Sequence, residues 1–291
     1  MLSYLQGWLF YYMKNKKLIV LISILAFVVL VVVLGSTVFT VRYSSINWLS
    51  STNKLNPEVD YSKTIEMPYG ESVFFVNKSK IINNLEQKNP YLKVISVETS
   101  FPNKLVVHVC ERQSLFAIEA LDSENNSVYA ILDEDMKVVE FMDKLTYFGL
   151  TKTQKPILID VSQTSLNFKD TDFPLGSFFQ NASLTNPLNE LIYAFKQVGY
   201  DSFTAKGLFE GVSIVKSIPI GASDSSGDNY ELTMNLKTKF GIDIVIRNSE
   251  KSLAEKLNIA IAAYNHQHDL GSTSGTITVY SNGVVSYTND D

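Results

Sequence analysis

The chain has few residues of the kinds that build disulfide frameworks, phosphate-binding loops or nucleic-acid surfaces. Cys110 is the one cysteine among 291 residues, so no internal disulfide can form. No glycine-rich phosphate-binding loop is present. The net charge is -5 and no Lys/Arg-rich run occurs, which excludes the electrostatic footprint that nucleic-acid binding needs. Since 45% of the residues are hydrophobic, core packing must hold the structure together.

A long stretch without charge lies near the N-terminus. No residue from Leu18 to Val41 is charged, and about 20 consecutive apolar residues are needed to cross the hydrocarbon core of a membrane. The preceding residues include lysines and no acid, so the positive-inside rule predicts a cytoplasmic tail over 1–17, a transmembrane helix over 18–40 and an extracytoplasmic remainder. A cleaved signal peptide is the alternative, which the long apolar run and the poor cleavage site at Leu34-Gly-Ser36 disfavour.

The first extracytoplasmic unit, over 41–113, alternates short strands with helical segments. Pro90 ends a helix whose apolar residues recur at helical spacing, because the residue before a proline disfavours helical dihedrals. Apolar and polar residues then alternate in two strands joined around Pro102 and Asn103, which predicts a hairpin. The expected elements are a strand at Tyr43–Trp48, a weak helix or turn at Asn56–Ile65, a helix at Lys78–Gln87, and strands at Leu92–Phe101 and Lys104–Glu111.

The second unit, over 114–288, is expected to be a mostly antiparallel β domain with two packed helices, and 289–291 form a short tail. Ser252-Leu-Ala-Glu255 has the spacing of a capping box and predicts the start of the second helix. Asn282-Gly283 between two apolar runs predicts a final hairpin. The fold class is therefore α+β. The first helix is expected at Pro187–Gly199, and strands at Leu115–Leu121, Val128–Leu132, Pro156–Val161, Val212–Ile220, Tyr230–Leu236, Ile242–Ile246, Thr276–Tyr280 and Val284–Tyr287.

Two pairs of side chains invite a chemical interpretation. His108 and Cys110 are two residues apart on one strand and so share a face, as a Cys/His nucleophile pair would need. Packing in the core beneath the helices is the favoured alternative. His266 and His268 could begin a metal site, but no third ligand has a useful spacing and a solvated helix end is favoured. We therefore expect no metal and no cofactor.

Two acidic segments also have plain interpretations. Asp133-Glu-Asp135 offers carboxylates of the kind that hydrolyse glycosidic bonds, but adjacent acids after a strand usually form a turn. Asp224–Asp228 resembles a metal loop superficially and is better explained as a hairpin tip. Since no catalytic set of residues can be assembled, we expect the chain not to be an enzyme.

The last hairpin is the strongest candidate for a binding surface. Val284–Thr288 has no later strand in the sequence to cover it, which predicts a sheet edge. Such an edge exposes unpaired backbone donors and acceptors, which a partner can use for strand addition. No Pro or Lys guards Thr276–Thr288, and Tyr280 and Tyr287 can add contact area. An earlier strand of the same domain that covers this edge is the alternative.

The order of motifs resembles the FtsQ/DivIB family of cell-division proteins. The first unit has a glycine, an apolar strand end, a short helix, Pro90-Tyr-Leu and a strand that closes on Glu111-Arg112, like the POTRA domain of that family. The second unit has Tyr230-Glu-Leu232, a glycine turn, an apolar strand, a helix with Lys-Leu and a last strand, like the family's β domain. The chain departs from the family pattern after Arg112, at Asp133–Met136 and across 143–183.

The resemblance implies a POTRA domain with the order β-α-α-β-β, followed by the family's β domain. It implies a single-pass divisome scaffold, enriched at the division septum, that binds FtsB/DivIC-like and FtsL-like single-span coiled-coil proteins by strand addition. The POTRA domain would then face other divisome proteins. A membrane-anchored cell-wall enzyme and another POTRA-type docking protein are the alternatives. The implied partner-binding residues are Thr276, Thr278, Tyr280, Val284, Val285 and Tyr287, with Tyr230 and Ile244 beside them.

Overall fold

The computed structural model describes residues 2–50, 54–162, 166–217 and 230–290, without the side chains of 2–15, 17 and 34–36. The chain divides into two compact units. The first comprises the residues up to Lys88 together with Leu92–Cys110, and the second comprises Asn89–Tyr91 together with the residues from Glu111 onward.

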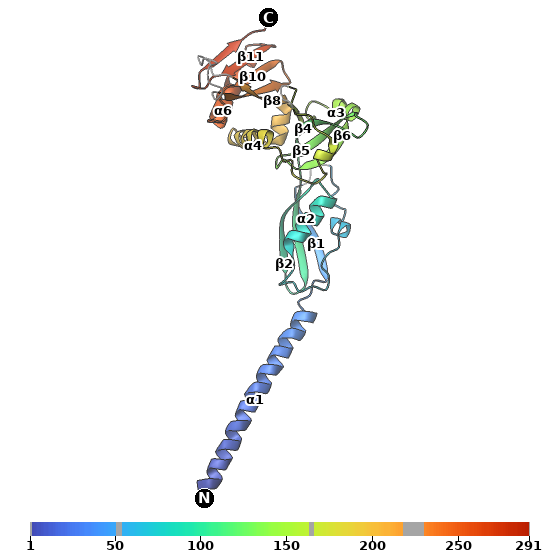
Figure 1. The fold of residues 1–291 in the computed structure, drawn as a ribbon, viewed down its shortest axis with the longest axis vertical. Helices are drawn as coiled ribbons and strands as arrows, with labels where there is room; N and C mark the ends of the chain where they lie inside the picture. The colour runs from blue at the N-terminus through green and yellow to red at the C-terminus, as the bar shows by residue number, and fades with distance from the viewer. Residues whose placement is uncertain (1, 51–53, 163–165, 218–229, 291) are drawn as a thin grey trace. The chain divides into compact units, whose positions relative to one another are not determined.

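The N-terminal element is a long helix, α1, over Leu2–Thr37 (Figure 1). Its side chains from Leu18 to Val33 are all exposed, and all but Ser23 are apolar. Among the described residues, no helix has the length and apolarity that crossing a membrane requires. The transmembrane helix expected over 18–40 is therefore not confirmed and stays a prediction.

A three-stranded sheet with α2 packed on it follows α1. Leu105, Val107 and Val109 are fully buried at alternate positions of one strand, because they share a core with Ile81 and Leu85 of the helix. The first strand and the last are parallel neighbours, although they lie far apart in the sequence. The strand order is β1 (Tyr43–Ser50), β3 (Lys104–Glu111) and β2 (Leu92–Ser100), and α2 covers Lys78–Lys88.

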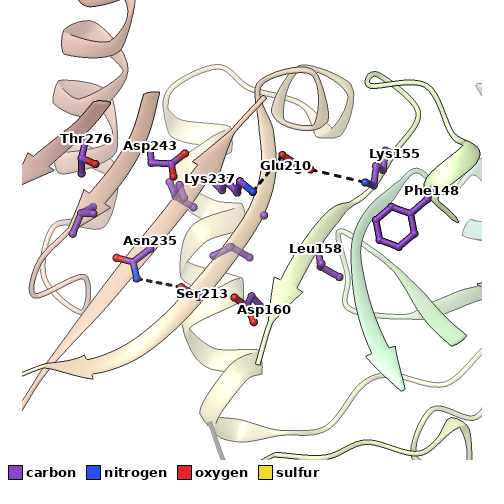
Figure 2. Close-up of a pocket in the computed structure, with 14 residues that line it drawn as sticks. Phe148, Lys155, Leu158, Asp160, Glu210, Ser213, Asn235, Lys237, Asp243 and Thr276 are labelled. Carbon is purple, nitrogen blue, oxygen red and sulfur yellow. Dashed lines mark hydrogen bonds and ion pairs between the residues drawn. The ribbon is translucent and has the colours of Figure 1, made fainter. Parts of the chain in front are cut away.

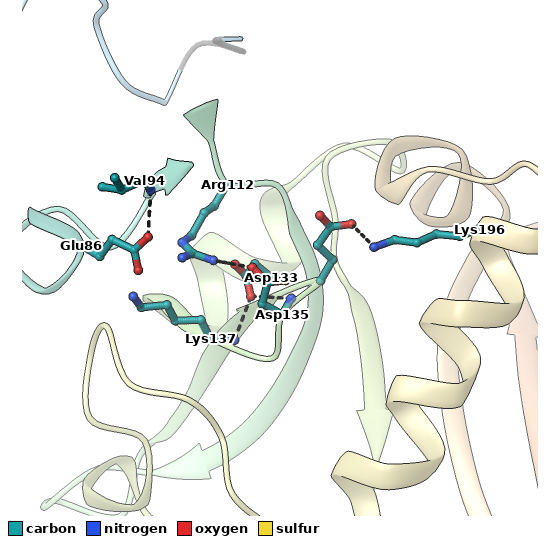
Figure 3. A network of polar contacts seen from close by, with 8 residues as sticks. Glu86, Val94, Arg112, Asp133, Asp135, Lys137 and Lys196 are labelled. Carbon is teal, nitrogen blue, oxygen red and sulfur yellow. Dashed lines mark hydrogen bonds and ion pairs between the residues drawn. The ribbon is translucent and has the colours of Figure 1, made fainter. Parts of the chain in front are cut away.

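Two acidic side chains satisfy backbone donors in this first unit. Asp60 accepts a hydrogen bond from the Ser62 N–H at 3.2 Å and caps η1 (Tyr61–Thr64), a 3-10 turn in the predicted weak helix. Hydrogen bonds from Ser62 hold the pKa of Asp60 below its ordinary value. Glu86 is buried on α2 and accepts a hydrogen bond from the Val94 N–H at 2.8 Å (Figure 3). The edge strand β2 thereby loses one exposed donor.

The second unit is built on one nine-stranded sheet with the order β12-β11-β10-β9-β8-β7-β4-β5-β6. The neighbours β10 and β11, β4 and β7, and β7 and β8 are parallel, and the others are antiparallel. The chain is thus α+β, with the large sheet that its strand pattern predicts. The strands are β4 (Ser114–Leu121), β5 (Ser127–Asp133), β6 (Val138–Asp143), β7 (Ile157–Asp160), β8 (Phe209–Ser217), β9 (Glu231–Thr238), β10 (Ile242–Ile246), β11 (Gly275–Val279) and β12 (Val285–Thr288).

Helices cover the two faces of this sheet unequally. α4 (Ala182–Gln197) and α6 (Leu253–Asp269) share one continuous core with one face of the sheet (Figure 1). α3 (Lys144–Gly149) packs on the opposite face, where Tyr147 stacks on Tyr129 of β5 with ring centroids 4.2 Å apart. Among the strands, α3 packs mainly on β5 and β6, and the described helices α4, α5 (Ser202–Leu208) and α6 contribute to the core on the other face. No described helix is therefore centred on the face of α3 over β8 to β11.

Some predicted helix boundaries are wrong. α4 begins at Ala182 and contains Pro187, which was expected at the helix start. Ser252 has a φ of 51°, in the left-handed region, and its side chain makes no capping hydrogen bond, so the expected capping box does not form. The short helix α5 (Ser202–Leu208) was not expected, although Asp201 caps it through the Thr204 N–H at 2.7 Å. A second 3-10 turn, η2, covers Asp170–Asp172.

A buried ionic network closes the turn between β5 and β6. Arg112 Nη1 lies 2.5 Å from Asp133 Oδ2 and 2.8 Å from Asp135 Oδ2, and the side chains of Arg112 and Asp133 are 3% and 1% exposed (Figure 3). Asp133 Oδ1 also accepts hydrogen bonds from the backbone N–H groups of Asp135 and Lys137. The acids at 133–135 therefore form a turn, as expected, in which Arg112 pairs with Asp133 and Asp135.

Arg112→Met should test how much the second unit depends on this network. The substitution leaves the buried Asp133 carboxylate without its cation, which typically costs about 3–5 kcal/mol. Chemical denaturation followed by circular dichroism measures the loss. Glu134→Gln is the matched control, because the Glu134–Lys196 pair in the same turn is partly exposed and such pairs contribute about 0–1 kcal/mol. Equal effects of the two substitutions would contradict this account.

Candidate binding site

The strand β12 forms one end of the nine-stranded sheet. Its one neighbour in the described strand order is β11, with which it pairs antiparallel from Val279–Val285 to Thr276–Thr288. The predicted sheet edge is therefore confirmed. The alternative, in which an earlier strand covers this edge, is not what the described part of the chain shows.

The hairpin turn determines which backbone groups of β12 point outward. The Tyr280 N–H donates a hydrogen bond to the Val284 carbonyl at 2.9 Å. In an antiparallel ladder, residues that exchange hydrogen bonds alternate with residues that do not. Ser286 and Thr288 therefore direct their backbone groups toward β11, whereas Val285 and Tyr287 direct theirs away from it. An added strand would find its donors and acceptors at Val285 and Tyr287.

The side chains of these two residues point into the domain and hold β12 in place. Val285 and Tyr287 pack against the core that α6 shares with the sheet. The Tyr287 hydroxyl donates a hydrogen bond to the Ser274 carbonyl at 2.7 Å. The tyrosine ring lies so close to Gly275 that a Cβ there would come within 2.6 Å of Tyr287 Cε2. The Tyr287 ring can therefore pack in this position only because residue 275 has no Cβ.

A second set of polar contacts fixes the hairpin turn to β9. The Ser281 hydroxyl donates a hydrogen bond to Glu231 Oε2 at 2.9 Å, and Arg247 Nη1 lies 3.3 Å from Glu231 Oε1. Glu231 is buried at the start of β9. Tyr230, directly before it, is 56% exposed and so lies on the surface beside the strand that anchors the turn.

A groove of about 500 Å³ lies on the helix-free face of the sheet (Figure 2). Its floor consists of residues from β7 to β11, and Phe148 of α3 and Thr276 of β11 belong to its lining. Thr276 is the neighbour of Thr288 in the β11–β12 ladder. The groove therefore reaches the strand next to the open edge.

The groove carries charges of both signs. Glu210 lies between two lysines, with its carboxylate oxygens 4.0 Å from Lys155 Nζ and 3.9 Å from Lys237 Nζ (Figure 2). Asn235 Nδ2 donates a hydrogen bond to Ser213 Oγ at 3.2 Å. Partial burial raises the pKa of Asp243, although its carboxylate accepts a hydrogen bond from the Thr238 N–H. Such a polar surface suits a polar or amphipathic peptide better than an apolar ligand.

The structure places the predicted partner-binding residues of β10 to β12 in four different surroundings. Thr276 and Thr278 lie on the helix-free face, and Tyr280 and the 55% exposed Val284 border the turn. Val285 and Tyr287 offer backbone groups rather than side chains. Ile244 is fully buried on β10, between β9 and β11, so its expected place at the binding surface disagrees with its position.

The groove residues outside β11 are not among the predicted site residues. They come from separate strands that only the folded sheet brings together, and their polar side chains give no local motif. Asn235, Lys237 and Asp243 alternate with the buried residues Leu236, Ile242 and Ile244 on β9 and β10, and so they face away from the core. Nothing in the sequence indicated which face of the sheet the helices leave uncovered.

The conceivable Cys/His pair does not form a nucleophile site. His108 and Cys110 share one face of β3, but it is the half-exposed face opposite the core, so their expected packing beneath the helices is wrong. Leu105, Val107 and Val109 occupy the core face. The two ring nitrogens of His108 lie 3.0 Å from Asn47 Nδ2 and 3.6 Å from Glu98 Oε2, and so they are engaged away from the thiol.

The sequence suggested two possible metal-binding segments, the one with His266 and His268 and the one at Asp224–Asp228. His268 stacks on Tyr264 with ring centroids 6.0 Å apart and lies edge-on to Phe240 at 6.1 Å. Within the residues that the structure describes, no group of three His, Cys, Asp or Glu side chains is placed to hold a metal ion. Asp224–Asp228 lies outside the described residues.

Comparison with known proteins identifies the domain type of the first unit and supports a family for the chain. The model of the POTRA domain, FtsQ-type, matches residues 61–112. A cell division protein DivIB of Clostridium tetani is 23% identical over 79% of this chain and 74% of its own length. DivIB of Clostridium botulinum strain Hall is 31% identical over 35% of this chain and 38% of its own length. These matches support the FtsQ/DivIB family for this chain.

The match over 61–112 identifies the three-stranded unit as an FtsQ-type POTRA domain. The matched range ends at Arg112, the residue that begins the buried ionic network of the second unit. The Glu-Arg sequence that closes the FtsQ/DivIB pattern thus has a structural explanation here, because Arg112 pairs with two acids of the β5–β6 turn. FtsQ/DivIB proteins are cell-division proteins and are not a known enzyme family.

Gly275→Ala should loosen β12. The residue has a φ of 138°, and the added Cβ would lie 2.6 Å from Tyr287 Cε2 and 2.7 Å from the Thr288 carbonyl oxygen. We expect a loss of about 1–3 kcal/mol in stability and faster hydrogen exchange along β12. Gly283→Ala is the control, since Gly283 also has a positive φ but has no atom within 4 Å of the added Cβ. Equal losses of stability and equal exchange rates in the two variants would contradict the claim that the Tyr287 ring needs a glycine at position 275.

Proposed function

We propose that the chain is a membrane-anchored divisome scaffold whose β12 edge receives a strand from a partner protein. The observation that carries this proposal is the open edge itself. It pairs with β11 on one side and directs the backbone groups of Val285 and Tyr287 outward. The matches to FtsQ/DivIB cell-division proteins support the divisome role. Strand addition suits this edge because main-chain hydrogen bonds supply affinity with little need for exposed side chains.

The proposed partners are FtsB/DivIC-like and FtsL-like single-span proteins, which the resemblance to FtsQ/DivIB proteins implies. A partner strand laid along β12 would leave the adjoining part of the partner near Thr276, where the groove begins. Tyr280, Val284 and Tyr230 would flank the hairpin turn and contact the partner with their side chains. Lys155, Glu210 and Lys237 would then select a segment of complementary charge.

The proposed topology places the N-terminus in the cytoplasm and both folded units outside it. α1 and the exposed apolar side chains from Leu18 to Val33 support an anchor, and the lysines before them support the orientation. We further propose enrichment at the division septum, contacts of the POTRA domain with other divisome proteins, and no catalytic role for this chain.

Val285→Pro should abolish capture of a DivIC-type partner by the full-length protein. Proline removes the outward N–H while it leaves the ladder bonds of Ser286 intact, and prolines are tolerated at strand edges where the N–H faces solvent. We expect the dissociation constant to rise at least tenfold, which corresponds to a loss of about 1.4 kcal/mol in binding free energy. Titration of the two proteins in detergent measures this constant.

Val285→Thr is the matched control, since it preserves the backbone donor and the approximate side-chain volume. The Thr variant should bind the partner like the natural protein. Circular dichroism of both variants verifies that the sheet is folded. A folded Pro variant that binds as tightly as the Thr variant would remove β12 from the proposed interface.

A further inference from the structure

A cluster of aromatic rings, most of them exposed, lies beside the end of α1, and none of its members is used by the proposed partner site. Phe39 follows the helix by two residues, and its ring centroid is 5.5 Å from that of Phe74 and 6.4 Å from that of Phe101. The Phe74 and Phe101 centroids are 5.6 Å apart. We call these three residues, together with Phe75, the aromatic patch.

The patch is unusually exposed for such large apolar side chains. Phe74, Phe75 and Phe101 are 57%, 86% and 62% exposed, whereas Phe116, Phe173 and Phe209 of the second unit are almost wholly buried. Leaving apolar area in water forgoes about 25 cal/mol per Å². A contiguous exposed apolar patch on a folded domain commonly marks a surface for a protein or a membrane.

Backbone hydrogen bonds hold the patch next to the end of α1. The Val73 N–H donates to the Phe39 carbonyl at 2.8 Å, and the Val41 N–H donates to the Glu71 carbonyl at 2.8 Å. Arg42 bridges back to the helix, since its Nη2 donates to the Thr37 carbonyl at 2.8 Å. The rings therefore cannot drift far from the point where the apolar helix ends.

Exposed cations lie close to the patch in sequence. Arg42, Lys78 and Lys104 each follow a member of the patch by three residues, and all three are exposed. Glu71 is an exposed acid nearby. Aromatic and aliphatic side chains with Lys or Arg beside them are typical of surfaces that lie in the boundary between lipid headgroups and acyl chains. Cations additionally favour anionic lipids.

We propose that the aromatic patch inserts into the outer interface of the membrane that α1 crosses. This inference rests on the proposed function, since it requires α1 to be the anchor. A bilayer is the occupant because the patch is continuous with α1, whose exposed apolar side chains would be covered by the same bilayer. Insertion would tie the POTRA domain to the membrane surface at a second place beside the helix.

A lipid-quenching experiment tests the insertion on the full-length protein. The chain is reconstituted in vesicles of phosphatidylcholine and phosphatidylglycerol, with Cys110→Ser and Phe75→Cys labelled by an environment-sensitive fluorophore. Phe203→Cys in the same background is the matched control, since Phe203 is 61% exposed but lies on α5 in the second unit. Ile95→Cys is the control within the POTRA domain, on β2.

The expected result is strong quenching of the label at position 75 by lipids that carry a spin label near the headgroup, and none at 203 or 95. A vesicle-bound protein that resists alkaline carbonate yet shows no quenching at position 75 would overturn the inference and leave the anchor standing. Release of the protein by carbonate would overturn the anchor, and the inference with it.

Discussion

The antiparallel pairing of β11 with β12 is the interaction on which the proposed binding site depends. It fixes the register from Val279–Val285 to Thr276–Thr288, and the register decides which backbone groups remain outside. Because hydrogen-bonded and non-hydrogen-bonded pairs alternate, Val285 and Tyr287 direct their donors and acceptors away from β11, while Ser286 and Thr288 complete the ladder. A shift of one residue would reverse both sets.

The strand β12 must be held firmly on the sheet while its outward backbone groups stay accessible. Tyr287 meets the first requirement, since its ring lies against Gly275 and its hydroxyl binds the Ser274 carbonyl. The turn beyond it is tied to Glu231 through Ser281. Side chains thus supply the stability of β12, which leaves the outward backbone groups available. This division of roles explains why a short edge strand can be ordered before any partner arrives.

Local signals in the sequence predicted most strands and the longer helices, but β6, α3 and α5 were not predicted. Asn282-Gly283 indicated the last hairpin, and alternation of apolar and polar residues indicated β2 and β3. The parallel neighbours β4, β7 and β8 were not predicted, because their pairing joins segments far apart in the chain. The groove was missed for the same reason. The capping box at Ser252 failed because the backbone there is left-handed, which spacing alone does not reveal. Arg112 was recognised as part of a motif, but its pairing with the buried Asp133 and the partly exposed Asp135 required the fold.

Residue-resolved hydrogen exchange of β12, with and without a DivIC-type partner, tests the central claim most directly. Strand addition should slow exchange at the amides of Val285 and Tyr287, whose N–H groups point away from β11. The amide of Ser286, which already lies in the ladder, should change little. Tight partner binding with unchanged exchange at Val285 and Tyr287 would contradict the account, because the partner would then be held without using the open edge.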